Sequence, residues 1–397
     1  MTEKKKFFTI FPKYRDFHFF KDPGQLPFRF LKNGFDAAII CYQNEKDYPA
    51  TNKHIPMKCI TKNYLTRKFN LGLIIYLLRM GRRIDILNMF HFTWQTLLLG
   101  YVYKMINHGG FLYIKMDNCH DSGNYPWETI FDPTIIVEDH FKHKDTFKLR
   151  LKHYLIKKMF VDKVDLWSVE DEESQKYYEN KYPFFKNKLV TSYNGHAVDL
   201  IDRPPVKEFE EKENIILTAG RLGTHQKATE VLLEAFRIVA ARLSWSLYLA
   251  GGIEPSFEKI ILKFFTNNPE LTGRVHFCGL VGKKELFELY NRSKIFCLAS
   301  RFEGFAVVYP EAMYFGNAII TTPYSSLKEM IIKKKFGAIV EKDAPEALAE
   351  CVLDLIGDEY KLREYADNAR QLSATEFNWN EIVLKLKSNI EERNCHS

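Results

Sequence analysis

One stretch, residues 295–316, constrains the fold more than any other part of the chain. It opens with the apolar run Ile295 to Leu298 and continues through Gly304 and Pro310. Glycine permits a tight turn and proline fits a helix only in its first turn, so the stretch predicts a strand, a turn and a helix in that order. The backbone N–H groups of such a turn and helix start form an anion site, in which a diphosphate would fit.

Two carboxylates, Glu303 and Glu311, bracket this turn with seven residues between them. A carboxylate does not bind phosphate, so beside a phosphate site its partners would be hydroxyl groups, such as those of a sugar or a ribose. The alternative is structural. Glu311 would complement the positive end of the helix, and Glu303 would be a solvated turn residue. Taken by themselves, the two residues favour this structural alternative.

The stretch resembles the Glu-(seven residues)-Glu motif of retaining GT-B glycosyltransferases, specifically glycosyltransferase family 4. The resemblance implies that Glu303 contacts the donor sugar and that Glu311 binds the ribose of the nucleotide. The donor-binding residues that it implies are Gly304, Phe305, Ala306, Val307 and Glu311. Ala306 stands where the family usually has glycine, which adds a methyl group where the backbone meets the ligand.

A second element precedes this motif. Residues 215–222 predict a strand that ends in a glycine turn, and residues 226–236 predict a helix. Arg221 and Lys227 would then project toward the crevice at the turn around residue 304, although each could instead be a surface cation. The pair resembles the family's Gly-Arg…Lys-Gly element, whose cations neutralise the donor diphosphate, with Ala228 in place of the second glycine. The catalytic residues that the resemblance implies are Arg221, Lys227 and Glu303.

The N-terminal half predicts a parallel α/β sheet. Residues 7–11 and 37–42 are apolar strands, and between them residues 21–27 predict a loop that leads into a helix ending at Asn33. Gly24 lies where GT-B N-terminal domains place a glycine-containing loop facing the interdomain cleft, so it is a donor-binding candidate. Further strands are predicted at residues 85–91, 110–116 and 163–169, and helices at residues 70–81, 94–106 and 147–160.

Polar residues follow two of these strands. His91 ends one strand, and Asp117 and His120 come directly after the next. Ligands of α/β sheets bind beyond the carboxyl ends of strands, so these three are acceptor-side candidates. The alternatives are a packed histidine for His91 and a loop residue for His120. Asp117, His120 and Asp121 also suit a hard cation, but the chain has no Asp-x-Asp motif, and we therefore expect neither a metal nor a cofactor beyond the donor substrate.

Composition sets the class of protein. The 397 residues suffice for two domains with separate cores, and seven cysteines without a Cys-x-x-Cys pair indicate reduced thiols in the cytoplasm. No run has the length of a membrane span or the form of a signal peptide, and no nucleic-acid module is present. The net charge of +7 and the basic pattern of residues 147–160 fit either a solvated surface or peripheral contact with the inner face of an anionic membrane.

Asn194-Gly195 resembles the signature that closes the N-terminal domain in this family, and residues 203–214, with two prolines and dense charge, predict a linker. The predicted fold class is therefore α/β, GT-B, with two Rossmann-like domains facing across a cleft. Residues 1–205 would form the acceptor-side domain, completed by a C-terminal helix at 378–397. Residues 206–377 would form the domain that binds the nucleotide sugar.

The resemblance implies a metal-independent, retaining glycosyltransferase of polysaccharide biosynthesis. It would move a hexose-type sugar from a nucleotide-diphosphate sugar to a glycan or lipid-linked acceptor. Fixed cations and N–H groups would stabilise the charge that develops on the departing diphosphate. Two alternatives stay open, a nucleotide-sugar 2-epimerase and a non-catalytic nucleotide-sugar-binding protein. A nicotinamide dehydrogenase is disfavoured because no Gly-x-Gly-x-x-Gly follows a strand in the expected place.

Overall fold

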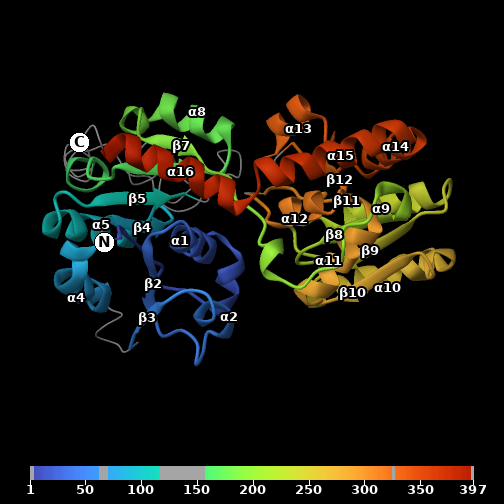
Figure 1. Ribbon diagram of the computed structural model, residues 1–397. Helices are drawn as coiled ribbons and strands as arrows, with labels where there is room; N and C mark the ends of the chain where they lie inside the picture. Colours follow the sequence, from blue (N-terminus) through green and yellow to red (C-terminus); the bar gives the residue numbers. More distant parts are fainter. Residues whose placement is uncertain (1–3, 62–69, 117–156, 304, 324–326, 395–397) are drawn as a thin grey trace, which may run out of the picture. The chain divides into compact units, whose positions relative to one another are not determined.

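The computed structural model describes residues 4–61, 70–116, 157–303, 305–323 and 327–394 (Figure 1). The chain divides into two compact units. The first comprises Met1–Tyr193 with Trp379–Ser397, and the second comprises Asn194–Asn378. The chain thus enters the second unit after Tyr193, whereas the sequence placed the boundary after residue 205. Within the described ranges, no helix is both long and apolar enough to cross a membrane.

The first unit is built on a parallel sheet whose described strands follow the order β3-β2-β1-β4-β5-β6-β7. All five residues of β4 and of β5 are buried, as expected of central strands in a parallel sheet with both faces covered. The strands are β1 (Lys6–Ile10), β2 (Asp36–Tyr42), β3 (Met57–Ile60), β4 (Ile86–Phe90), β5 (Phe111–Lys115), β6 (Leu166–Val169) and β7 (Leu189–Thr191).

Helices cover this sheet, and the C-terminal helix returns to it: the guanidinium of Arg29 in α1 donates to the Asn380 side chain of α16 at 3.2 Å. The helices are α1 (Asp22–Lys32), α2 (Pro49–Asn52), α4 (Leu71–Met80), α5 (Trp94–Ile106), α8 (Glu172–Lys181) and α16 (Trp379–Asn394). Short helical turns are η1 (Asp16–Phe20), η3 (Gly81–Arg83), η5 (Lys157–Val161) and η6 (Pro183–Phe185).

Residues 21–27 do not form the predicted loop. They begin α1, with Pro23 and Gly24 in its first turn, where proline is well tolerated because its position needs no backbone donor. The N–H group of Gly24 donates to the carbonyl of Lys21 at 3.1 Å. Gly24 is buried, and a Cβ there would lie 2.4 Å from the Cα of Phe19 in η1. Close packing against η1 therefore requires glycine at this position, and the loop prediction was wrong.

The other strands and helices predicted for the first half are confirmed where the structure describes the residues. The strands predicted at 7–11, 37–42, 85–91, 110–116 and 163–169 correspond to β1, β2, β4, β5 and β6, and the helices predicted at 70–81 and 94–106 correspond to α4 and α5. The basic helix predicted at 147–160 lies outside the described residues up to residue 156, and its last residues belong to η5.

The second unit has a parallel sheet whose described strands follow the order β10-β9-β8-β11-β12-β13, so the order reverses between β8 and β11. The strands are β8 (Glu213–Ala219), β9 (Ser246–Ala250), β10 (Val275–Gly279), β11 (Ser293–Cys297), β12 (Ala318–Thr321) and β13 (Gly337–Ile339). The helices are α9 (Thr229–Ala240), α10 (Glu258–Asn267), α11 (Lys283–Arg292), α12 (Val308–Tyr314), α13 (Lys328–Lys334), α14 (Pro345–Gly357) and α15 (Glu359–Thr375). Short turns are η7 (Val198–Leu200), η8 (Phe209–Glu211), η9 (Pro255–Phe257) and η10 (Pro269–Leu271).

Residues 203–214 are not a free linker. The side-chain amide of Asn291 donates to the carbonyl of Pro205 at 2.8 Å and accepts from the N–H group of Lys207 at 2.9 Å. Phe209 is buried in the core of the second unit, and β8 begins at Glu213. The prolines and charges of this segment suggest a linker, but Asn291 satisfies its backbone and fixes it to the sheet.

Candidate functional site

Two of the predicted catalytic residues meet at the carboxyl edge of the second sheet. Lys227 follows β8 and Glu303 follows β11, the neighbouring strands at which the strand order reverses. Open α/β sheets bind ligands at such a position. The ammonium group of Lys227 donates to Oε1 of Glu303, and the two side chains are only 13% and 7% exposed. The fold therefore brings an opposite-charge pair together where a ligand is expected.

Glu303 is held from its own turn as well. The hydroxyl of Ser300 donates to Oε1 of Glu303 at 2.8 Å, and the carbonyl of Ser300 accepts from the hydroxyl of Thr322 at 2.7 Å. Ser300 is fully buried and Glu303 nearly so. The interpretation of Glu303 as a solvated turn residue is therefore wrong, because its carboxylate is oriented by two donors inside the unit.

Lys227 lies in a turn rather than in the predicted helix. Helix α9 begins only at Thr229 because Ala228 adopts a left-handed φ of +46°. The N–H group of Lys227 donates to the carbonyl of Thr224 at 3.0 Å, and its aliphatic stem passes Gly220, where a Cβ would lie 3.1 Å from its Cε. Glycine would adopt the conformation of Ala228 without steric cost.

Arg221 joins the same cluster through a residue that the sequence did not single out. Its guanidinium donates to Oε1 of Gln226 at 2.8 Å. The amide of Gln226 in turn donates to the carbonyl of Phe302 at 3.2 Å, and its backbone carbonyl accepts from the N–H group of Arg301 at 2.9 Å. Gln226 therefore ties the turn before α9 to the turn that carries Glu303.

Glu311 belongs to a second, separate pair. It lies in the first turn of α12, its side chain is 2% exposed, and it accepts from the ammonium group of Lys283 at the start of α11. The hydroxyl of Tyr290 lies 3.5 Å from its other oxygen. Burial, reinforced by the negative charge of Glu311, raises the pKa of Tyr290 well above its ordinary value, so this phenol stays protonated.

Lys283 was missed by the sequence reasoning. The available signal was its place, a cation at a helix start after the glycine that ends β10. The remaining donor-binding candidates are distributed around Glu303. Phe305 is buried against Phe377 at 5.5 Å between ring centres, Ala306 and Val307 are half-buried before α12, and Gly304 lies outside the described residues.

The backbone at the carboxyl ends of β8 and β9 is closely packed. Gly251 has a φ of +140°, and a Cβ there would lie 1.7 Å from the carbonyl oxygen of Gly220. Its N–H group donates to the carbonyl of Gly279, at the end of β10, at 2.7 Å. Only glycine fits at position 251, because both its backbone conformation and its contact with Gly220 exclude a side chain.

Of the acceptor-side candidates, His91 is described, and it has a strained backbone. It directly follows β4 with a left-handed φ of +62°, its N–H group donates to the carbonyl of Lys115 at 2.9 Å, and its ring centre lies 5.6 Å from that of Phe11. Such strain in a non-glycine residue is often found at functional sites. Asp117 and His120 lie outside the described residues. Gly24 and His91 belong to the first unit, so their contact with a ligand of the second stays a prediction.

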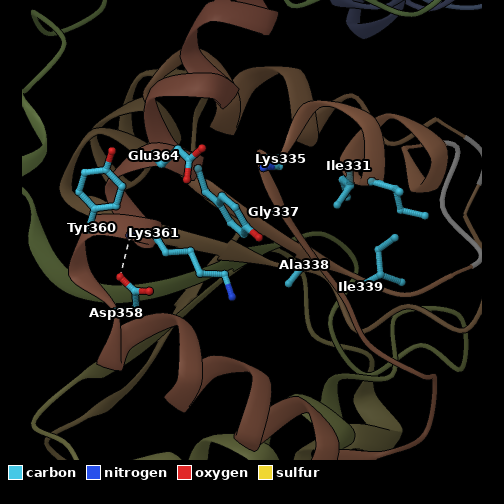
Figure 2. A pocket seen from close by; sticks show the side chains of 11 residues that line it. Ile331, Lys335, Gly337, Ala338, Ile339, Asp358, Tyr360, Lys361 and Glu364 are labelled. Carbon is cyan, nitrogen blue, oxygen red and sulfur yellow. Dashed lines mark hydrogen bonds between the residues drawn. The ribbon is translucent and has the colours of Figure 1, made fainter.

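A separate hollow of about 580 Å³ lies in the second unit, beside the edge strand β13 (Figure 2). Its lining includes Tyr360, Lys361 and Glu364 of α15 and Lys335, which follows α13. None of the predicted site residues lines it, so it is distinct from the cluster around Glu303.

The chain is similar in sequence to known glycosyltransferases. Residues 202–372 match the family model described as glycosyl transferases group 1. The chain is 26% identical over 207 residues to an uncharacterized glycosyltransferase of Methanocaldococcus jannaschii. The matched segment covers 52% of this chain and 54% of that protein. It is 27% identical over 190 residues to GalNAc-alpha-(1->4)-GalNAc-alpha-(1->3)-diNAcBac-PP-undecaprenol alpha-1,4-N-acetyl-D-galactosaminyltransferase of Campylobacter jejuni, covering 45% and 50%. The chain spans about half the length of the curated relatives it matches.

Solved structures resemble the whole chain. A glycosyltransferase from Rickettsia africae superposes with a TM-score of 0.75 at 15% identity, covering 99% of this chain and all of that one. HepE from Anabaena, solved in complex with UDP, gives a TM-score of 0.72 at 14% identity, covering 98% of this chain and all of that one. At such identities the likeness concerns the fold alone, and it confirms the predicted GT-B fold with two Rossmann-like sheets.

Proposed function

Because the chain belongs to the glycosyl transferases group 1, family 4 of the GT-B glycosyltransferases, we propose that it transfers a sugar from a nucleotide-diphosphate sugar to an acceptor hydroxyl with retention of configuration. The observation that carries the proposal is the buried pair of Lys227 and Glu303 at the switch point of the second sheet. This pair supplies a cation for the diphosphate and a carboxylate for sugar hydroxyls within one contact distance.

The chemical step needs stabilisation of the leaving group. The bond between the anomeric carbon and the diphosphate oxygen breaks, negative charge grows on the diphosphate, and the acceptor oxygen bonds to the anomeric carbon on the same face. The departing phosphate takes the proton of the acceptor hydroxyl. Lys227 and Arg221, with the N–H groups of residues 304–307, would neutralise the growing charge, and preorganised donors of this kind act where charge develops.

The pair of Lys227 and Glu303 predicts what changes when the donor binds. Lys227 is paired with Glu303, so a diphosphate that binds the ammonium group would compete with the carboxylate for it and draw the pair apart. The displaced carboxylate is still oriented by Ser300 and is then available to accept hydrogen bonds from sugar hydroxyls. Donor binding would thus exchange one internal ion pair for two contacts to the ligand.

Glu311 would accept hydrogen bonds from the ribose of the nucleotide. Its carboxylate is buried, and burial of a lone charge is unfavourable unless it is paired. Lys283 supplies the pairing charge and, at 36% exposure, is the more solvent-accessible partner. A ribose hydroxyl would therefore approach from the side of Lys283.

The donor would be a hexose-type sugar nucleotide, and the acceptor a glycan or a lipid-linked glycan. The C. jejuni relative, by its name, extends a glycan carried on an undecaprenol diphosphate. The first unit would bind the acceptor, with His91, Asp117 and His120 as the candidate residues. The strained backbone of His91 at a strand end is the structural observation that supports its candidacy.

A screen of UDP-, GDP- and ADP-sugars for thermal stabilisation tests the proposal first, since a ligand that binds only the native state raises the melting temperature by mass action. The stabilising donor is then incubated alone and with glycan or lipid-linked acceptors, and the products are identified by mass spectrometry and NMR. We expect an α- or β-linked product with the donor's own anomeric configuration. An epimerised donor formed without acceptor would identify an epimerase, and stabilisation without turnover of any kind would identify a binding protein.

A further inference from the structure

Helix α4 of the first unit carries an exposed apolar stripe. Leu71, Ile75 and Leu78 are 41%, 45% and 61% exposed, and their spacing of four and three residues places them on one face of the helix. The opposite face is buried, with Leu73 and Leu77 in the core of the unit. Exposed single leucines are ordinary on protein surfaces, but three in register on one helix face form an apolar strip that water solvates poorly.

Exposed cations follow the apolar stripe along the chain. Arg79 in α4 comes four residues after Ile75, Arg82 in the turn η3 comes four residues after Leu78, and Arg83 is exposed on the same turn. Beside η3 is a hollow of about 460 Å³ lined by Lys4, Lys5, Lys6, Arg82, Arg83 and Asp85. The one carboxylate in this lining, that of Asp85, accepts from the N–H group of Lys6 at 2.7 Å. The hollow therefore presents an excess of positive charge to an anion.

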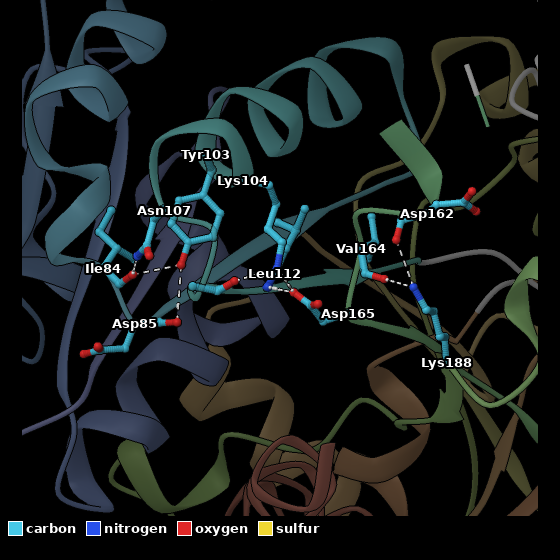
Figure 3. Close-up of polar contacts among 11 residues, drawn as sticks. Ile84, Asp85, Tyr103, Lys104, Asn107, Leu112, Asp162, Val164, Asp165 and Lys188 are labelled. Atoms are coloured by element: carbon cyan, nitrogen blue, oxygen red, sulfur yellow. Dashed lines mark hydrogen bonds and ion pairs between the residues drawn. The ribbon is translucent and has the colours of Figure 1, made fainter. Parts of the chain in front are cut away.

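The turn that carries these arginines is held in place by side-chain donors (Figure 3). The hydroxyl of Tyr103 in α5 and the amide of Asn107, which directly follows α5, donate to the carbonyl of Ile84 at 2.8 and 2.9 Å. The amide of Asn107 also reaches the carbonyl of Gly81 at 3.3 Å, and Gly81 packs against the side chain of Ile106. Arg82 and Arg83 are thus displayed on a fixed turn directly after the apolar stripe, and little ordering is needed when they bind.

We propose that the α4–η3 face, defined as Leu71, Ile75, Leu78, Arg79, Arg82 and Arg83, docks the protein onto an anionic lipid bilayer. The three apolar side chains would enter the boundary between headgroups and acyl chains, and the arginines with the adjacent hollow would bind lipid phosphates. The helix lies on the surface rather than across the membrane, because α4 has only ten residues. An apolar stripe in line with cations fits a bilayer better than a soluble polyanion, which would give the stripe no partner.

The proposal goes beyond the proposed function and can be tested without it, since vesicle binding requires neither donor nor transfer. The full chain is floated with phosphatidylcholine vesicles, with or without a minority of phosphatidylglycerol, at about 0.1 M and about 1 M salt. Two variants probe the face, Arg82→Gln/Arg83→Gln and Ile75→Asn/Leu78→Asn. Helix α10 offers matched controls, Ile260→Asn/Leu262→Asn and Lys259→Gln/Lys263→Gln. It also has two exposed apolar residues and two exposed lysines, but Ile260 and Leu262 are two residues apart and so form no apolar stripe.

We expect the wild type to bind the anionic vesicles at low salt and to be released at high salt. Each arginine near the surface is worth about fivefold, so the arginine variant should lower the partition coefficient roughly 30-fold. The apolar variant should lower it about tenfold or more. The α10 controls should stay within about twofold, and soluble glycerol phosphate should not displace the protein, which separates a bilayer from a free phosphate compound.

Several outcomes would overturn the proposal. One is that the wild type does not bind anionic vesicles, and another is that both face variants bind them as well as the wild type does. Loss in the arginine variant alone, with the apolar variant unaffected, would also overturn it, because the apolar side chains would then not enter the bilayer. If a variant fails to fold, amide hydrogen exchange of the wild type tests the proposal instead. Docking should slow the exchange of residues 71–83 when anionic vesicles are added, and an unchanged exchange rate there would refute the proposal.

Discussion

Replacing Lys227 and Glu303 one at a time should have different effects on the binding of a free nucleoside diphosphate. In the structure the two side chains neutralise each other while nearly buried. A nucleoside diphosphate carries the charge that suits Lys227 but lacks the sugar that suits Glu303. Lys227→Met should therefore weaken its binding, whereas Glu303→Gln should leave it intact or tighten it, because the variant removes the carboxylate that competes for the ammonium group.

The magnitudes follow from the contacts. Lys227→Met removes a charge-assisted hydrogen bond worth roughly 1.5 to 3 kcal/mol, which is a loss of about 10- to 150-fold in affinity. Glu303→Gln removes the internal competitor and should tighten binding by up to about tenfold. The double variant should bind as weakly as Lys227→Met, because no ammonium group remains to be released. Turnover with donor and acceptor should fall by roughly two to three orders of magnitude in both single variants.

Isothermal titration calorimetry with UDP, GDP and ADP measures these affinities, and melting temperatures report whether each variant is folded. The first unit provides a matched control, since Lys104 and Asp165 form an ion pair at 2.8 Å with side chains 14% and 27% exposed. Lys104→Met should affect stability in a similar way but leave nucleotide binding unchanged.

Equal losses of affinity in Lys227→Met and Glu303→Gln would refute the reasoning, because they would show that the pair supports the site only as a unit. Unchanged affinity and unchanged turnover in Lys227→Met, with normal melting, would reduce Lys227 to a structural partner of Glu303. Either result would leave the fold intact and remove the proposed exchange of partners on donor binding.

Three further predictions concern the second pair, metal ions and pH. Glu311→Ala should weaken nucleoside diphosphate binding about 10- to 150-fold, because a charge-assisted hydrogen bond to the ribose is lost. Lys283→Met should weaken the binding less, because Lys283 is partly screened by solvent. If calorimetry finds no loss in Glu311→Ala, the role of Glu311 is to complement the start of the helix. Transfer should proceed fully in EDTA, since lysine, arginine and backbone donors serve the diphosphate, and activity abolished by EDTA and restored by magnesium or manganese would contradict this. Burial lowers the pKa of Lys212 to about 7, so above that pH the unfolded state holds a proton that the folded state lacks, and the free energy of unfolding should rise with pH from about 7 toward the unfolded pKa near 10.5. Urea unfolding should show this rise in the wild type and a flatter profile in Lys212→Met. The carbonyls of Tyr290 and Ser293, which accept from Lys212, still accept from Asn317 in the variant. An equal rise in both proteins would show that other groups cause the pH dependence.

The sequence by itself determined the order and type of most elements, because the signals for them are local. Parallel strands buried on both faces read as short apolar runs, and β4, β5 and β11 were found in this way. The strand, turn and helix around Glu303 and Glu311 followed from glycine, proline and hydrophobic pattern. Where a local signal has two meanings, it misled: proline and glycine at residues 23 and 24 indicated a loop but begin α1.

Only the tertiary structure decided which charges meet. Lys227 and Glu303 are 76 residues apart in the chain, and Lys283 and Glu311 are 28 apart. No local pattern encodes either contact, because each depends on the order of strands in the sheet. The order reverses at β8 and β11, so the loops after these two strands leave the same edge side by side, and residues far apart in sequence become partners there.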